Sequence, residues 1–243
     1  MLATGMYIPS FSDDLQWATP GGDAAFYVPR LIEEDEPQVL GNISDFKEAC
    51  TRHDISYRVH GDLGAHVLEG IRRETRFADL LIIGLEIYNR ENARVFADDD
   101  LRQIIENSEC PVLLVPPVAS FPENIIIAYD GTEGSVHALK MFSYIFPEMS
   151  TLPAMVVFAS SKANEIPEGD YIKELAARHF SQLSFSVLEF NPKKYFVTWM
   201  EERPKPLLVA GAYGRSELSQ LFKRSFIRDL LEEHPVPVFI AHK

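Results

Sequence analysis

Cysteine is scarce in this chain of 243 residues: Cys50 lies in a helical pattern and Cys110 just before a strand pattern. We interpret both as small core residues, so nothing indicates an oxidising compartment. Positive charge is also scarce, and the formal net charge of −13 opposes binding to nucleic acid and to acidic membrane surfaces. No apolar run is long enough to cross a membrane, and the first residues lack the pattern of a signal peptide. These absences predict a soluble, cytoplasmic protein.

The stretch at residues 206–243 has the pattern of half a parallel α/β unit. It contains an apolar run at 207–210, a turn with Gly211 and Gly214, a helical pattern, and a second apolar run at 236–241. Short apolar runs bounded by glycine or proline are typical of buried strands. The order strand, glycine turn, helix, strand therefore predicts parallel strands joined by a helical crossover.

The same stretch occurs a second time, at residues 78–117. When residues 80–84 are aligned with 207–211, a one-residue gap places Pro111 and Val112 on Pro237 and Val238. We interpret this match as a duplicated domain, for which the length and the 46% hydrophobic content suffice. The proline-rich segment 115–122 is the expected linker. The predicted domains are residues 1–119 and 120–243.

The second domain is expected to alternate strands and helices throughout. Its expected strands are 125–129, 154–159, 184–188, 207–210 and 236–241, and its expected helices are 135–146, 171–180 and 194–202, with a further helical pattern before the last strand. In the first half we expect strands at 2–9 and 55–59, helices at 33–53 and 65–77, and a long loop at 11–32. The alternating order in the second domain predicts an open parallel sheet that binds ligands at the carboxyl ends of its strands.

Three segments of the second domain resemble a universal stress protein domain: residues 125–132 (IIIAYDGT), the Gly211-x-x-Gly214 turn with Ser225, and residues 237–240. The resemblance covers the whole second domain and residues 33–117 of the first. It implies an α/β fold of two tandem Rossmann-like domains, each with the strand order 3-2-1-4-5. It also implies that the two last strands, 112–115 and 236–241, pair with each other as an intrachain pseudo-dimer, in a chain that is a monomer or a homodimer.

The first domain departs from the family pattern, because too few residues precede the helix end near Phe46 for two complete β-α units. Our preferred interpretation is that residues 2–9 form the family's second strand and that the first β-α unit is missing. The alternative is that residues 6–10 form the first strand, followed by a collapsed helix. In either case we expect an incomplete domain.

The resemblance also implies a candidate nucleotide site in the second domain. Nucleotide-binding members have two glycines separated by two residues, then nine residues, a third glycine and Ser or Thr, and main-chain NH groups of that loop hold the phosphates. Gly211, Gly214 and Ser225 fit this spacing, but Arg224 replaces the third glycine. Asp130, followed by Gly131, would contact the ribose and adenine; the structural reading of Asp130 is a turn or a helix cap.

The first domain keeps Gly84, but Asp98 and Asp99 stand at the places of Arg224 and Ser225. Carboxylates at a helix N-terminus satisfy the NH groups that a phosphate would use and repel a triphosphate. We therefore predict a structural first domain that binds no nucleotide. A metal site at residues 98–100 is the weaker interpretation, since no other ligands are spaced for it. His60 and His66 likewise lack a third ligand.

No catalytic pattern stands out in the sequence. There is no Gly-x-Ser-x-Gly turn, and Ala128 occupies the place at which Asp-x-Asp-Gly-Thr hydrolases have their nucleophile. We therefore predict no catalytic residues, no metal site and no enzyme activity. The preferred function is a stress-response protein that acts through protein partners, which the sequence does not identify. The alternative is an adenine-nucleotide (ATP) sensor acting through the second domain.

Overall fold

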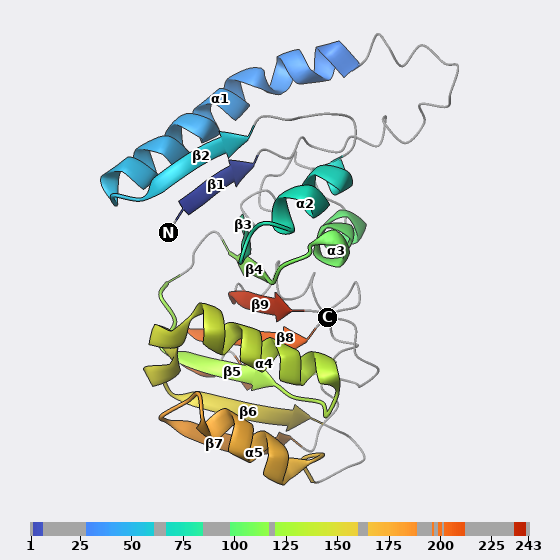
Figure 1. The fold of residues 1–243 in the computed structure, drawn as a ribbon, viewed down its shortest axis with the longest axis vertical. Coiled ribbons are helices and arrows are strands. Elements are labelled where there is room, and N and C mark those ends of the chain that lie inside the picture. The colour runs from blue at the N-terminus through green and yellow to red at the C-terminus, as the bar shows by residue number, and fades with distance from the viewer. Residues whose placement is uncertain are drawn as a thin grey trace, which may run out of the picture. The chain divides into compact units, whose positions relative to one another are not determined.

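The structure, a computed structural model, describes residues 2–6, 28–60, 67–84, 98–116, 120–159, 165–188, 196, 199–200, 202–211 and 236–241 (Figure 1). The chain forms two compact units, residues 1–71 and 72–243. The predicted boundary between residues 119 and 120 separates the two copies of the duplication. The copies of a duplication need not be the compact units of the chain, so this boundary stays a prediction.

The first unit is a βαβ unit. Strand β1 (Leu2–Met6) pairs in parallel with β2 (Ser56–His60), and helix α1 (Val28–Arg52) connects them. Phe46 of α1 contacts Tyr57 of β2 edge to face, with ring centroids 6.0 Å apart. A parallel pair with a helical connection is the form expected here, and the strand predicted at 2–9 is found over residues 2–6.

The helix of the first unit begins earlier than expected. Residues 28–32 were predicted to belong to a long loop, but α1 already begins at Val28. Proline usually interrupts a helix, and Pro29 is the second residue of α1. In the first turn, however, its missing NH has no partner to lose and its fixed φ suits the helix. The loop prediction is therefore wrong over these residues, while 7–27 lie outside the described part.

The second unit contains a seven-stranded sheet with the order β3-β4-β9-β8-β5-β6-β7. Its strands are β3 (Leu81–Gly84), β4 (Val112–Val115), β5 (Asn124–Ala128), β6 (Ala154–Ala159), β7 (Leu183–Leu188), β8 (Pro206–Gly211) and β9 (Val238–Ala241). Its helices are α3 (Asp98–Asn107), α4 (Glu133–Ile145) and α5 (Gly169–Ala177), with the 3-10 turn η4 (Pro147–Thr151); helix α2 (Val67–Thr75) crosses the division between the units.

All neighbouring strands of this sheet are parallel except β4 and β9. The predicted α/β class with an open, mostly parallel sheet is confirmed. Within residues 120–243 the order is β7-β6-β5-β8-β9, so the first strand of this half lies in the middle. The same order in two tandem domains stays a prediction.

The two halves of this sheet meet at the antiparallel pair β4–β9. Val112 lies opposite Ile240, Leu113 opposite Phe239, and Leu114 opposite Val238. The predicted pairing of these two strands is confirmed. Its physical reason is that both are short apolar strands, and an apolar edge strand is stabilised when another strand covers it.

Each face of the sheet carries one hydrophobic core. Helices α4 and α5 cover one face (Figure 1), and the buried residues there include Leu139, Phe142, Ile172, Val209 and Phe239. Helix α3 and the segment near residue 196 cover the other face, with Leu101, Ile105, Val112, Phe196 and Ile240 buried. Parallel strands buried on both faces are continuously apolar, as the runs in β5, β8 and β9 show.

The two copies of the repeat differ in how the α4 face is covered. Val209 in β8 is fully buried, and helix α4 packs on that strand. The aligned residue of the first copy, Ile82 in β3, is 61% exposed. On the opposite face, Val112 of the first copy is as fully buried as the aligned Val238. The described residues therefore cover this face of β3 less completely than α4 covers β8.

This difference predicts unequal effects for one substitution at the two aligned positions. We expect Val209→Thr to lower the free energy of unfolding by about 1–3 kcal/mol, because it buries a hydroxyl in an apolar core. We expect Ile82→Thr to change it by less than about 0.5 kcal/mol, because that side chain is mostly in water. Urea-induced unfolding followed by circular dichroism measures both. Equal losses would contradict the difference in cover.

Candidate functional site

The candidate site lies at the carboxyl ends of β5 and β8. These strands are parallel neighbours, with Ala128 opposite Ala210. The turn at Asp130 and Gly131 follows β5, and Gly211 ends β8. Three of the six predicted site residues are thus brought to one edge of the sheet, where open α/β sheets bind their ligands. Gly214, Arg224 and Ser225 lie outside the described residues, so their role stays a prediction.

Asp130 organises the turn that starts helix α4. Its Oδ1 accepts hydrogen bonds from Thr132 N at 2.9 Å and from Thr132 Oγ1 at 2.5 Å. Thr132 is the N-cap of the helix, and its side chain accepts from Ser135 N at 3.4 Å. A carboxylate that satisfies backbone NH groups in this way stabilises the turn. The structural reading of Asp130 is therefore realised.

The segment before helix α5 packs over this turn. Gly131 has a left-handed φ of 79°, and a Cβ on it would lie 2.9 Å from Pro167 Cβ. The Tyr129 hydroxyl donates a hydrogen bond to Pro167 O at 3.0 Å. Glycine is required at position 131 for both reasons, the backbone conformation and the close approach of Pro167.

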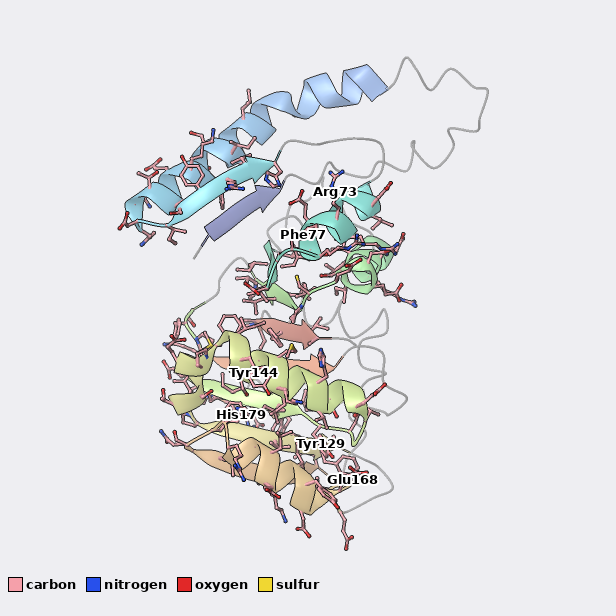
Figure 2. All side chains as sticks on the ribbon, in the orientation of Figure 1. Arg73, Phe77, Tyr129, Tyr144, Glu168 and His179 are labelled. Atoms are coloured by element: carbon pink, nitrogen blue, oxygen red, sulfur yellow. The ribbon has the colours of Figure 1, made fainter. Side chains whose placement is uncertain are left out.

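The electrostatic field at this turn is negative. Tyr129 and Glu168 lie at the same end of the sheet (Figure 2). Burial raises the pKa of the Tyr129 phenol, and the charges of Glu168 and Asp130 raise that pKa further. A low-dielectric position beside two carboxylates disfavours any additional negative charge.

The Tyr129 phenol should ionise at a higher pH than an ordinary tyrosine. Its folded-state pKa lies above the unfolded value of about 10, so its contribution to stability is intact below that pH and is lost as pH rises through the folded-state pKa. The difference in 295 nm absorbance between the parent and Tyr129→Phe, recorded during an alkaline titration, isolates this phenol. A midpoint at or below about 10, the ordinary value for tyrosine, would contradict the raised pKa of this buried phenol.

Gly211 has a packing role that does not involve a ligand. A Cβ on it would lie 2.4 Å from the carbonyl carbon of Gly134 and 2.7 Å from Ser135 N, in the first turn of α4. The end of β8 and the start of α4 thus approach backbone to backbone. No atom of the described residues lies within 4 Å of such a Cβ on Gly84, the aligned glycine of the first copy. Sequence reasoning missed Gly134; a glycine in the first turn of a helix was the available signal.

The structure is similar to that of a universal stress protein from Archaeoglobus fulgidus DSM 4304. The TM-score is 0.63 at 16% sequence identity, over 93% of this chain and 82% of that one. A proposed universal stress protein from Pseudomonas aeruginosa UCBPP-PA14 gives a TM-score of 0.52 at 12% identity, over 99% and 92% of the two chains. The chain has the universal stress protein fold.

The cytoplasmic domain of a prokaryotic cation chloride cotransporter is also similar. Its TM-score is 0.50 at 14% identity, over 83% of this chain and 79% of that one. The sequence matches no protein-family model and no curated protein. The likeness to universal stress proteins is thus a likeness of fold.

In the first copy of the universal stress protein pattern, helix α3 begins at Asp98, so Asp98 and Asp99 stand in its first turn as the capping interpretation requires. Their side chains lie outside the described residues. Among the described residues, no group of three or more His, Cys, Asp or Glu side chains is placed to hold a metal ion. Within the same part of the chain, no helix is both long and apolar enough to span a bilayer.

Proposed function

We propose that this chain is a cytoplasmic stress-response protein of the universal stress protein type, which acts by binding protein partners and not by binding a nucleotide. The observation that supports it is the turn at the end of β5. There the Asp130 carboxylate accepts hydrogen bonds from Thr132, and the segment carrying Pro167 and Glu168 packs against the turn. The carboxylate that the resemblance assigns to the ribose and adenine is thereby used by the turn itself.

The proposal includes the tandem arrangement. The second domain has the strand order 3-2-1-4-5, and the first has lost its first β-α unit. Three observations support this: β1 pairs with β2 as a family's second and third strands would, β3 ends the seven-stranded sheet, and Ile82 on β3 is 61% exposed. The antiparallel pair β4–β9 then joins the two domains as an intrachain pseudo-dimer. The likeness to a domain of a cotransporter supports a role as a module of a larger assembly.

The test combines nucleotide analysis with partner capture. We expect protein that is purified gently from its own cells to carry no adenine nucleotide by mass spectrometry, and isothermal titration with MgATP to give no binding heat. We expect a stoichiometric protein partner to remain bound to the full chain when MgATP is added. One equivalent of co-purified nucleotide, or release of the partner by MgATP, would overturn the proposal.

The second candidate function is an ATP sensor acting through residues 120–243. The observation that favours it is that Asp130, Gly131 and Gly211 share one edge of the sheet, where the family places its ligand. If this second function holds, the side chain at Arg224 determines how well the loop can bind the phosphates. That side chain stands where a glycine exposes backbone NH groups to phosphate.

We expect Arg224→Gly to strengthen MgATP binding, because several phosphate contacts depend on the loop backbone and only one on the guanidinium. Arg224→Ala should strengthen it less, since alanine keeps a Cβ that disfavours positive φ. Isothermal titration of both variants and the parent measures the effect. If the parent binds MgATP and Arg224→Gly abolishes that binding, Arg224 is a phosphate ligand and the sensor becomes the preferred function.

A further inference from the structure

The second unit contains a cavity of about 510 Å³ that lies apart from the Asp130 turn. We call it the Arg72 cavity. Its lining comes from α2, from α4, and from the end of α3 with the turn that leads to β4: Arg72; His137 and Met141; and Glu106, Asn107, Ser108, Glu109, Cys110 and Pro111. The volume falls in the range of sites for small organic molecules.

The two carboxylates of the lining are already paired with cations that do not line the cavity. Glu106 Oε1 lies 2.7 Å from Arg102 Nε. Glu109 accepts two hydrogen bonds from Arg76, at 2.7 and 2.8 Å. The hydrogen bond from Arg76 lowers the pKa of Glu109, with a smaller contribution from the charge of Arg72. Both carboxylates are therefore compensated, and they add little net negative charge to the cavity.

Arg72 differs from these paired arginines. Among the described residues, its hydrogen-bond partner is a neutral amide: Nη2 donates to Asn107 Oδ1 at 2.5 Å. A guanidinium carries five N–H donors in a planar fork that matches an oxyanion, so this bond leaves most of that capacity to a ligand. Asn107 is itself oriented by a 2.8 Å bond from its Nδ2 to Gln103 O. The cation is thus positioned without being neutralised by that contact.

The rest of the lining mixes polar and apolar residues. His137 and Met141 are four residues apart on α4, so they share one face of that helix. Burial raises the pKa of the Cys110 thiol, which therefore stays neutral, and Ser108 Oγ is used by a 2.7 Å bond to Cys110 O. Met141 and Pro111 supply the apolar surface against which the body of a ligand can pack.

We propose that the Arg72 cavity binds a small organic oxyanion, a carboxylate or a phosphate monoester on a compact apolar body, with Arg72 as its charge partner and Met141 and Pro111 against the body. The proposal does not depend on the proposed function, because none of these residues belongs to the Asp130 turn. It gives the chain a ligand site even where nucleotide is absent.

The test uses the full chain and three probes: benzoate, phenyl phosphate, and the neutral control benzamide. We expect benzoate or phenyl phosphate to bind with one-to-one stoichiometry by isothermal titration at concentrations up to about 10 mM, and benzamide not to bind. Arg72→Gln should weaken the bound oxyanion roughly tenfold or more, because a charge-assisted pair is lost. The affinity of Arg72→Lys for the oxyanion should lie between those of the parent and Arg72→Gln, since an ammonium cannot make the bidentate contact.

Arg73→Gln is the matched control, because it removes the same charge from the next residue of the same exposed helix turn, outside the cavity lining. It should leave the affinity within about twofold, as expected for a screened surface charge. The position of the probe is checked by ¹³C-methyl NMR of methionine, in which the Met141 resonance, assigned with Met141→Leu, should shift. Failure of both oxyanions to bind, equal binding of benzamide, or equal weakening by Arg72→Gln and Arg73→Gln would overturn the proposal.

Discussion

Replacing Phe239 by alanine should lower the free energy of unfolding of the second unit by about 3–5 kcal/mol, the range for a fully buried phenylalanine. Phe239 has no exposed surface and lies in β9, between β4 and β8. Its ring contacts Phe142 and Phe146 edge to face, with centroids 5.4 and 6.0 Å away. The cavity left behind would therefore weaken the core under α4 and the strand pair that joins the two halves of the sheet.

Urea-induced unfolding followed by circular dichroism and tryptophan fluorescence measures this loss. Phe239→Leu keeps most of the volume and should cost less than about 1.5 kcal/mol. Phe121→Ala is the matched control at a side chain that is 71% exposed, and we expect a change within about 0.5 kcal/mol. If Phe239→Ala and Phe121→Ala were equally mild, Phe239 would not be a central core residue.

The second large effect is expected from one methyl group at the end of β8. Gly211→Ala places a Cβ 2.4 Å from the backbone of Gly134, so either the strand end or the start of α4 must move. Backbone shifts of this kind cost about 1–3 kcal/mol. For a unit of this size we expect a decrease in the melting temperature of roughly 5–10 °C by scanning calorimetry.

Gly84→Ala provides the control, because it makes the same change at the aligned position of the first copy, where none of the residues that the structure describes has an atom within 4 Å. There we expect no loss, or a gain of up to about 1 kcal/mol from the less flexible unfolded chain. The comparison also bears on the nucleotide question. If Gly211→Ala lost MgATP binding, the displaced backbone at the start of α4 would be a sufficient cause. That variant alone therefore does not show that Gly211 contacts a phosphate.

The features that the sequence predicts well are those carried by repetition and by apolar runs. The alignment of residues 80–84 with 207–211 identified the last strand of each copy, and the resemblance to universal stress proteins implied that these two strands, β4 and β9, pair. The run at 125–129 likewise predicted a central buried strand, and β5 is that strand. A short, continuous apolar segment is stable only where both of its faces are buried, so its place inside a sheet can be predicted from the sequence.

The features that the sequence does not predict depend on contacts between distant segments. Nothing local indicates that Pro167 packs on Gly131, or that Gly211 meets Gly134, since each contact is set by the packing of α4 and α5 on the sheet. The Arg72 cavity is a stronger case. Its charge balance follows from the pairing of Glu109 with Arg76 across 33 residues of sequence. From the helical pattern of α2 alone, Arg72 would be interpreted as an ordinary surface charge.

The position of β9 in the sheet has a consequence for biosynthesis. This strand is the last one described along the chain, yet it lies between β4 and β8 and hydrogen-bonds to both. During translation, β4 and β8 therefore leave the ribosome with one edge each unpaired, and they stay so until residues 238–241 emerge. Unpaired apolar edges are sites at which strands of other chains add. The nascent chain should consequently be exposed to strand addition at β4 and β8 until β9 emerges, and the two halves of the sheet can pair only after residues 238–241 have left the ribosome.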